Sequence, residues 1–134
     1  MTNLFAVFII LHGLVHLWYV TLSLRLVAHM PEMGWSGESW LLTRVLGDAA
    51  TRAISTLLYG LACLGFVAAG AGLLLGQPWF RPMMLRSAVV SLVAIGGFWD
   101  GKTSQIVEKG IIGFTISLLV VIALVVFGWP PGIA

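Results

Sequence analysis

The sequence predicts an all-α, membrane-embedded up-down bundle of four transmembrane helices, with a short interfacial helix in the first connection. Composition is the first reason: hydrophobic residues make up 60% of the chain and charged residues 9%, against about 25% charged residues in a soluble domain. The second is that the apolar residues fall in four long runs, each near the roughly 20 residues that cross a bilayer core. The length of 134 residues suits one domain over 1–134.

The four apolar runs are predicted to be helices because lipid offers the backbone no hydrogen-bond partners. Their expected bounds are residues 4–28, 53–75, 83–99 and 110–128. Gly76 and Pro78 mark the break between the second and third runs, and Asp100 and Gly101 mark the next break. Connections this short predict that neighbouring helices pack antiparallel. The segment 129–132, which contains two prolines, is expected to end the fourth helix at the interface.

The first connection is longer and has a helical pattern of its own. Ser36 suits the N-cap of a short helix over 37–46, and Gly47 suits its end. We expect this helix to lie flat at the level of the lipid headgroups. An ordered loop that Trp35 and Trp40 anchor at the interface is the alternative.

The charged residues limit which partners and which membrane orientation can be predicted. Seven basic and five acidic residues give a net charge of +2, too little for a nucleic-acid-binding face, so no nucleic-acid partner is expected. Five basic residues lie on the side of the first and third connections and two on the other side. This asymmetry predicts that the termini lie on the non-cytoplasmic side of a cell membrane, with the bacterial cytoplasmic membrane favoured.

A polar stripe on the first helix is the one candidate functional feature. His12, His16, Tyr19 and Ser23 are spaced i, i+4, i+7 and i+11 and so share one helix face. Polar side chains on one line are expected to face the bundle interior or another chain. If the other helices run antiparallel as predicted, several of their polar groups lie at a depth in the membrane similar to that of the two histidines. The candidate ligand-binding residues are therefore His12, His16, Tyr19, Ser23, Cys63 and Ser91, with Ser117 at the same level.

The two histidines have more than one interpretation. Imidazoles at i and i+4 can bind one metal ion, but Cys63 is the only further ligand expected at that depth. A haem iron bound by one of them would need its second axial ligand from another chain. A metal ion or haem is therefore possible as a cofactor and not favoured. The favoured alternative is that both rings hydrogen-bond to neighbouring helices and lock the bundle.

Small residues suggest close approach between helices. Residues of this kind recur about every fourth position in the second and fourth apolar runs. The predicted helix-packing positions are Gly65, Ala68, Gly72, Gly76, Gly113 and Ser117. Their partner could be another helix of this chain or a second chain.

These features favour a small non-enzymatic membrane protein that acts as an interaction or accessory subunit of a membrane complex. Catalytic residues are not predicted, since no acid lies at mid-depth to complete a triad with a histidine. The expected partners are the lipid bilayer and either another protein or further copies of this chain. One alternative is a metal, haem or small-ligand site at His12 and His16. A second is a small transporter or channel, disfavoured because no carboxylate lies within the membrane.

Overall fold

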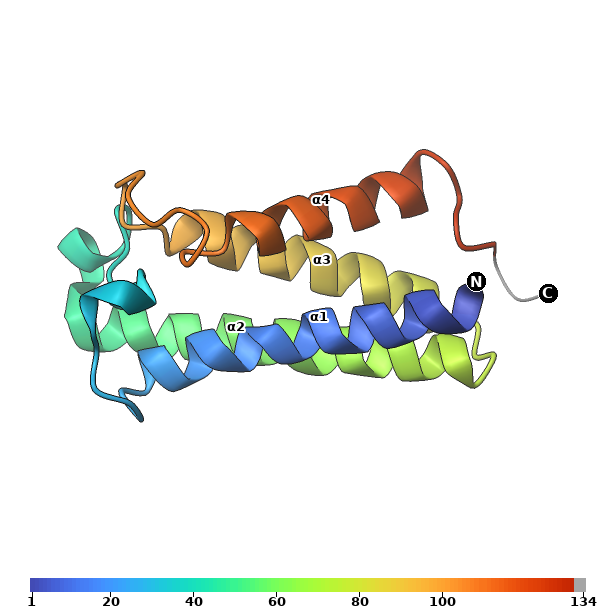
Figure 1. Cartoon of the computed structure of the whole chain (residues 1–134), viewed down its shortest axis with the longest axis horizontal. Coiled ribbons are helices and arrows are strands. Elements are labelled where there is room, and N and C mark those ends of the chain that lie inside the picture. Colours follow the sequence, from blue (N-terminus) through green and yellow to red (C-terminus); the bar gives the residue numbers. More distant parts are fainter. Residues whose placement is uncertain (132–134) are drawn as a thin grey trace.

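A computed structural model describes residues 1–131 and confirms the predicted all-α, up-down four-helix bundle (Figure 1). The helices are α1 (Thr2–Ser23), α2 (Thr43–Leu74), α3 (Phe80–Gly97) and α4 (Ile111–Val125), with a short 3-10 helix, η1 (Pro31–Met33), in the first connection. Extensive packing joins only consecutive helices, α1 to α2, α2 to α3 and α3 to α4. The last residue of the predicted stop at 129–132 lies outside the described residues.

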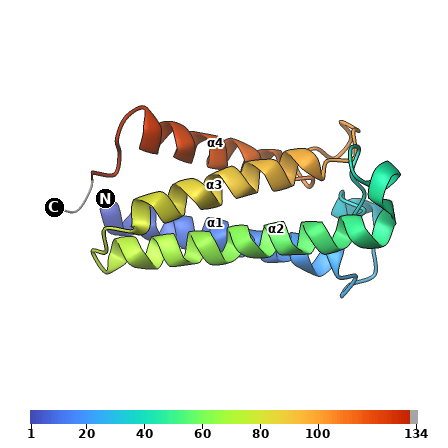
Figure 2. The ribbon, with the colours of Figure 1, turned by 180° about the vertical axis from the view of Figure 1, so that it is seen from behind.

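The helices differ in whether they can cross a bilayer. α1, α2 and α3 are each long and apolar enough to span a membrane. α4 is also apolar but has only 15 residues. At about 1.5 Å per residue it rises about 22 Å, which is less than the roughly 30 Å of a hydrocarbon core. The first and third connections lie together at one end of the bundle, and the N-terminus and the end of α4 lie at the other (Figures 1 and 2).

Two helix boundaries differ from those expected. α1 ends at Ser23 instead of residue 28, and Arg25 beyond it has a left-handed backbone with φ 54°. α2 begins at Thr43, ten residues before the expected start at 53, and bends at Gly47, where φ is 80° and ψ is 170°. α2 differs because an apolar run marks only the length that suits lipid, and a helix can begin before it. α1 instead ends inside its apolar run, just before the left-handed Arg25.

The predicted helix over 37–46 is confirmed only over residues 43–46, which form the first turn of α2. Over residues 37–42 the prediction is wrong, because these residues form a loop and turns. The N-cap of α2 is Leu42, without a side-chain cap bond, and Ser39 rather than Ser36 holds the turn before it. Ser39 Oγ accepts the backbone N–H groups of Leu41 and Leu42 at 3.2 and 3.0 Å. The Ser39 hydroxyl also donates to a carbonyl of α3. This docking onto α3 holds the loop away from a helical path.

Close approach between helices occurs within the chain. A Cβ added to Gly13 of α1 would lie 2.8 Å from the Phe66 Cβ of α2, and one added to Gly70 would lie 2.5 Å from Ile10. Gly65 leaves room for Ser87 of α3 in the same way. The first two glycines let α1 and α2 pack along most of their lengths, as both views show (Figures 1 and 2).

The other small residues that the sequence singled out have varied surroundings. Gly72 packs on Trp79, Gly113 lies beside Ile95, and Ala68 is half-buried. Gly76 follows the end of α2 with φ 66°. There its own N–H and that of Gln77 bond to carbonyls of the last helical turn, which is the usual way in which glycine ends a helix.

Candidate functional site: a buried histidine–serine network

The centre of the bundle holds four polar side chains from three helices. His12 and His16 of α1 are 5% and 2% exposed, and Ser91 of α3 and Ser117 of α4 are fully buried. The i, i+4 spacing places both rings on the inner face of α1, as the sequence analysis expected. The structure thus brings together His12, His16 and Ser91 of the candidate set, with Ser117 beside them. We call these four residues the central network.

The members of the central network are linked by hydrogen bonds. His12 Nε2 lies 3.1 Å from Ser117 Oγ, and the Ser117 hydroxyl donates to Ser91 Oγ at 2.9 Å. Ser91 Oγ lies 2.8 Å from His16 Nε2. His16 Nδ1 lies 3.0 Å from the backbone carbonyl oxygen of His12. The bonds therefore run from α1 through α4 and α3 and back to α1.

The chemistry of the partners assigns the protons in this chain of bonds. A carbonyl oxygen only accepts, so Nδ1 of His16 carries the proton that it donates to the His12 carbonyl. In a neutral His16 ring, Nε2 then accepts, and Ser91 must donate to it. Because Ser117 donates to Ser91, the remaining bond requires that His12 donate from Nε2 to Ser117. Two neutral histidines of opposite tautomer satisfy every bond.

Aromatic rings surround the two histidines. The Phe66 ring centroid lies 4.8 Å from that of His12 and 5.7 Å from that of His16. Phe8 stacks on His12 with a centroid distance of 6.4 Å, and Tyr59 lies 6.1 Å from His16. Within residues 1–131, no carboxylate or basic side chain bonds to the network. These surroundings favour neutral rings, since an unpaired buried charge is costly.

Two of the other candidate residues, Tyr19 and Ser23, form a separate layer nearer the connections, whereas Cys63 lies beside Gly13 at the level of the central network. The Tyr19 hydroxyl donates to the Glu108 carbonyl at 3.1 Å, and its ring stacks on Tyr59 with centroids 4.8 Å apart. Ser23 Oγ lies 2.8 Å from Thr56 Oγ1 of α2. Cys63 is buried and has no hydrogen bond in the described part of the chain. The single stripe predicted for α1 therefore divides into two groups with different partners.

Within the described residues, the central network does not supply a complete set of ligands for a metal ion. The described residues contain no group of three or more His, Cys, Asp or Glu side chains placed to share a metal. Both ring nitrogens of His16 and Nε2 of His12 are already in hydrogen bonds. A metal bound by both rings would have to break the bond from Ser91 to His16 or from His16 to the His12 carbonyl. Among these ring nitrogens, only Nδ1 of His12 has no hydrogen bond within residues 1–131.

Sequence reasoning missed a second polar region, partly buried, at the C-terminal end of α3. Trp35 Nε1 donates to the carbonyl of residue 98 at 2.7 Å, and Ser39 Oγ donates to that of residue 97 at 2.5 Å. Trp40 donates from Nε1 to the carbonyl of residue 96 at 3.0 Å and from its backbone N–H to that of residue 99 at 2.7 Å. We call Trp35, Ser39 and Trp40 the α3 cap. It gives partners to four consecutive carbonyls, those of the last two residues of α3 and of the two residues that follow.

Arg81 has a comparable role at the opposite end of the bundle. Its guanidinium donates to the carbonyls of Leu124 at 3.1 Å and Gly128 at 2.8 Å, and also to that of Pro130. Leu124 belongs to the last turn of α4. A cation there both satisfies free carbonyls and complements the negative end of the helix dipole. In the sequence, Arg81 contributed only to the charge count.

No protein-family model, curated protein or solved structure matches this chain. Its function is therefore inferred from the geometry of the central network and of the surface that the bundle presents. The described residues place no pair of nucleophile and base beside an acid in the bundle interior.

Proposed function

We propose that the chain is a non-enzymatic integral membrane protein that serves as an interaction or accessory subunit, with the seam between α1 and α4 as its contact surface for a second chain. The observation that carries this proposal is that α1 and α4 border each other without extensive packing. The His12–Ser117 bond is the single side-chain hydrogen bond between these two helices in the described structure.

An apolar groove of about 190 Å³ lies along this seam. Its walls are Phe5, Phe8, Ile116, Leu119, Val120 and Ala123. Both Phe8 and Leu119 are exposed there. Helices associate in lipid mainly through shape and close packing, because lipid tails are as apolar as the side chains. A groove fixed between two helices is the kind of surface that a further helix can fill.

The central network supports the same proposal from inside the bundle. Its four side chains bond to one another and to the backbone, so its function within the chain is to hold α1, α3 and α4 together. The His12–Ser117 bond keeps α4 at a set distance from α1. The network thus maintains the groove, and the groove provides the surface for a partner.

Cysteine crosslinking in native membranes tests the proposal. In a Cys63→Ala background, Leu119→Cys places a thiol in the seam, and Leu64→Cys places a matched exposed thiol on α2. We expect a benzophenone maleimide, attached to the introduced thiol and then irradiated, to give one discrete crosslinked species with Leu119→Cys and none with Leu64→Cys. A monomer in mild detergent together with no crosslink at Leu119→Cys would disprove an interaction subunit. Metal analysis and an absorption spectrum of the same protein test the alternative of a metal or haem at the histidines.

A further inference from the structure

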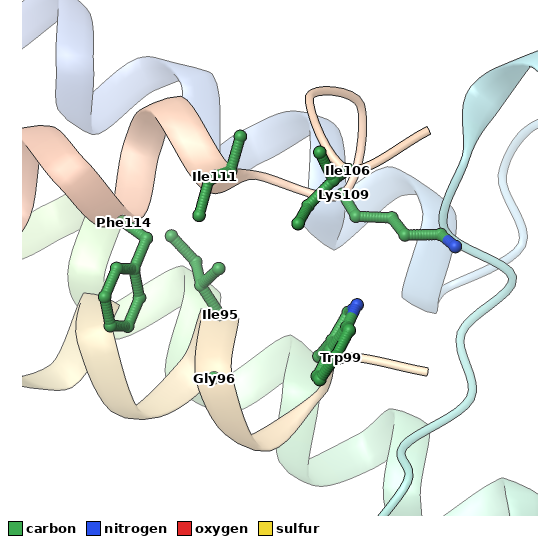
Figure 3. A pocket seen from close by; sticks show the side chains of 7 residues that line it. All are labelled: Ile95, Gly96, Trp99, Ile106, Lys109, Ile111 and Phe114. Atoms are coloured by element: carbon green, nitrogen blue, oxygen red, sulfur yellow. The ribbon is translucent and has the colours of Figure 1, made fainter. Parts of the chain in front are cut away.

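A second groove, of about 200 Å³, lies where α3 ends and α4 begins (Figure 3). Its walls are the side chains of Ile95, Trp99, Ile106, Ile111 and Phe114 and the aliphatic stem of Lys109. We propose that this end groove binds one acyl chain of an anionic phospholipid, whose phosphate contacts Lys102. The proposal concerns a lipid site and is independent of the protein partner proposed for the seam.

The polar atoms in the walls already have partners inside the chain. Trp99 Nε1 donates to the Lys102 carbonyl at 2.9 Å. Lys109 Nζ pairs with Asp100 Oδ2 at 2.8 Å, and the two side chains are only 3% and 9% exposed. Lys109 therefore presents its methylene stem to the groove while its charge is neutralised by Asp100. With no polar group free in the walls, the groove selects an apolar occupant.

Lys102, whose backbone adjoins the groove, carries a positive charge. The Lys102 carbonyl accepts from both Trp99 Nε1 and Lys109 Nζ, at 2.9 and 3.3 Å, so the Lys102 backbone is held beside two wall residues. The Lys102 side chain is exposed and forms no ion pair within the described residues. An exposed lysine beside an apolar groove complements a lipid that has a negative headgroup and a hydrocarbon tail.

The groove lies at the end of the bundle where tryptophans mark the membrane interface, which is the level of lipid headgroups. Trp99 lies in its wall and Trp40 lies close by at the end of the bundle, and tryptophans are typical of the membrane interface. Ile106 and Ile111 are exposed at the groove. Gly96 lines the floor, where an added Cβ would meet only Phe114, at 3.8 Å. The space above Gly96 is therefore open, and a phospholipid could place its tail there and its phosphate at Lys102.

Lipid retention measured by native mass spectrometry tests the proposal. The protein is delipidated in detergent and given equal amounts of phosphatidylglycerol and phosphatidylcholine. We expect about fivefold preference for phosphatidylglycerol, the effect of one lysine near a headgroup, and equal retention of the two lipids by Lys102→Gln. Gly96→Leu fills the groove and should lower retention of both lipids about tenfold. Gly97→Leu is the matched control, since an added Cβ there meets nothing within 4 Å.

Equal retention by Gly96→Leu and Gly97→Leu, or no lipid preference in the wild-type protein, would overturn the proposal. So would conversion of a wild-type dimer to a monomer by Gly96→Leu with lipid retention unchanged, because the groove would then belong to a protein contact. If Gly96→Leu fails to fold, wild-type protein in phosphatidylglycerol vesicles with a diazirine-bearing acyl chain gives the answer. Labelling concentrated on the peptides of Ile106 and Ile111 supports the site, and equal labelling of all exposed helix faces overturns it.

Discussion

The central network and the α3 cap both satisfy polar atoms through side-chain hydrogen bonds, but they join different parts of the chain. In the network, side chains of three helices bond to one another. In the cap, side chains of a loop bond to the free carbonyls of one helix. The network therefore sets how α1, α3 and α4 lie against each other, whereas the cap fixes a connection to the end of α3. Loss of the network should affect the whole bundle, and loss of the cap should affect one end.

His16→Ala should give the largest effect. It removes a buried ring with two hydrogen bonds, leaves Ser91 without its acceptor and opens a cavity. We expect a loss of about 2–4 kcal/mol in the free energy of unfolding, measured by steric trapping in bicelles. Cys63→Ala is the control, because Cys63 is a buried neighbour on α2 without a hydrogen bond to the network. Losses of equal size in the two variants would show that the network adds no stability beyond packing.

Trp35→Phe should be next in size and local in effect. It removes the donor that Trp35 Nε1 provides to the carbonyls of residues 98 and 38. We expect a loss of about 1–3 kcal/mol and faster hydrogen exchange confined to the last turn of α3. Trp40→Phe, at an exposed position, should cost less. Faster exchange along α1 and α4 would contradict the distinction between cap and network.

Ser91→Ala and Ser117→Ala should each cost about 1 kcal/mol, since hydrogen bonds within membrane bundles average less than that and each serine makes two. Because the two hydroxyls bond to each other, we expect the double variant to depart from additivity by about 0.5 kcal/mol or more. A double-mutant cycle of unfolding free energies measures this coupling. Strict additivity would mean that the bonds act separately and not as one chain.

The smallest effect should come from Arg25→Gln. Arg25 pairs with Asp48 at 3.0 Å, but both side chains are well exposed, and Arg52 also contacts Asp48. Exposed ion pairs contribute little, so the free energy of unfolding should change by no more than about 0.5 kcal/mol. A loss above about 1 kcal/mol in the same assay would mean that this exposed ion pair stabilises the bundle as much as the central network or the α3 cap does. That result would contradict the distinction drawn between them.

Sequence periodicity predicted the central network better than it predicted the cap. A polar stripe at i, i+4 stands out on an apolar helix, and register placed Ser91 and Ser117 at the depth of His12 and His16. The sequence could not show that these side chains satisfy one another, since that depends on how far apart α1, α3 and α4 lie.

The α3 cap left no comparable pattern. Its acceptors are backbone carbonyls, which every residue carries, so nothing in the side chains of residues 96–99 marks them as partners of Trp35 and Ser39. The start of α2 at Thr43 was missed for a related reason. Arg44, Asp48 and Arg52 interrupt the apolar pattern, although the helix continues through the last two beyond the bend at Gly47.

The tautomers of the two histidines test the central claim most directly. Solid-state NMR of ¹⁵N-histidine-labelled protein in lipid bilayers distinguishes the protonated from the unprotonated ring nitrogen, and His12→Gln and His16→Gln assign the signals. The hydrogen bonds require a neutral His16 with its proton on Nδ1 and a neutral His12 with its proton on Nε2. Three results would contradict the account: a neutral His16 with its proton on Nε2, protonation of both nitrogens in the ring of His12 or of His16, or a nitrogen signal of either ring shifted by a bound metal.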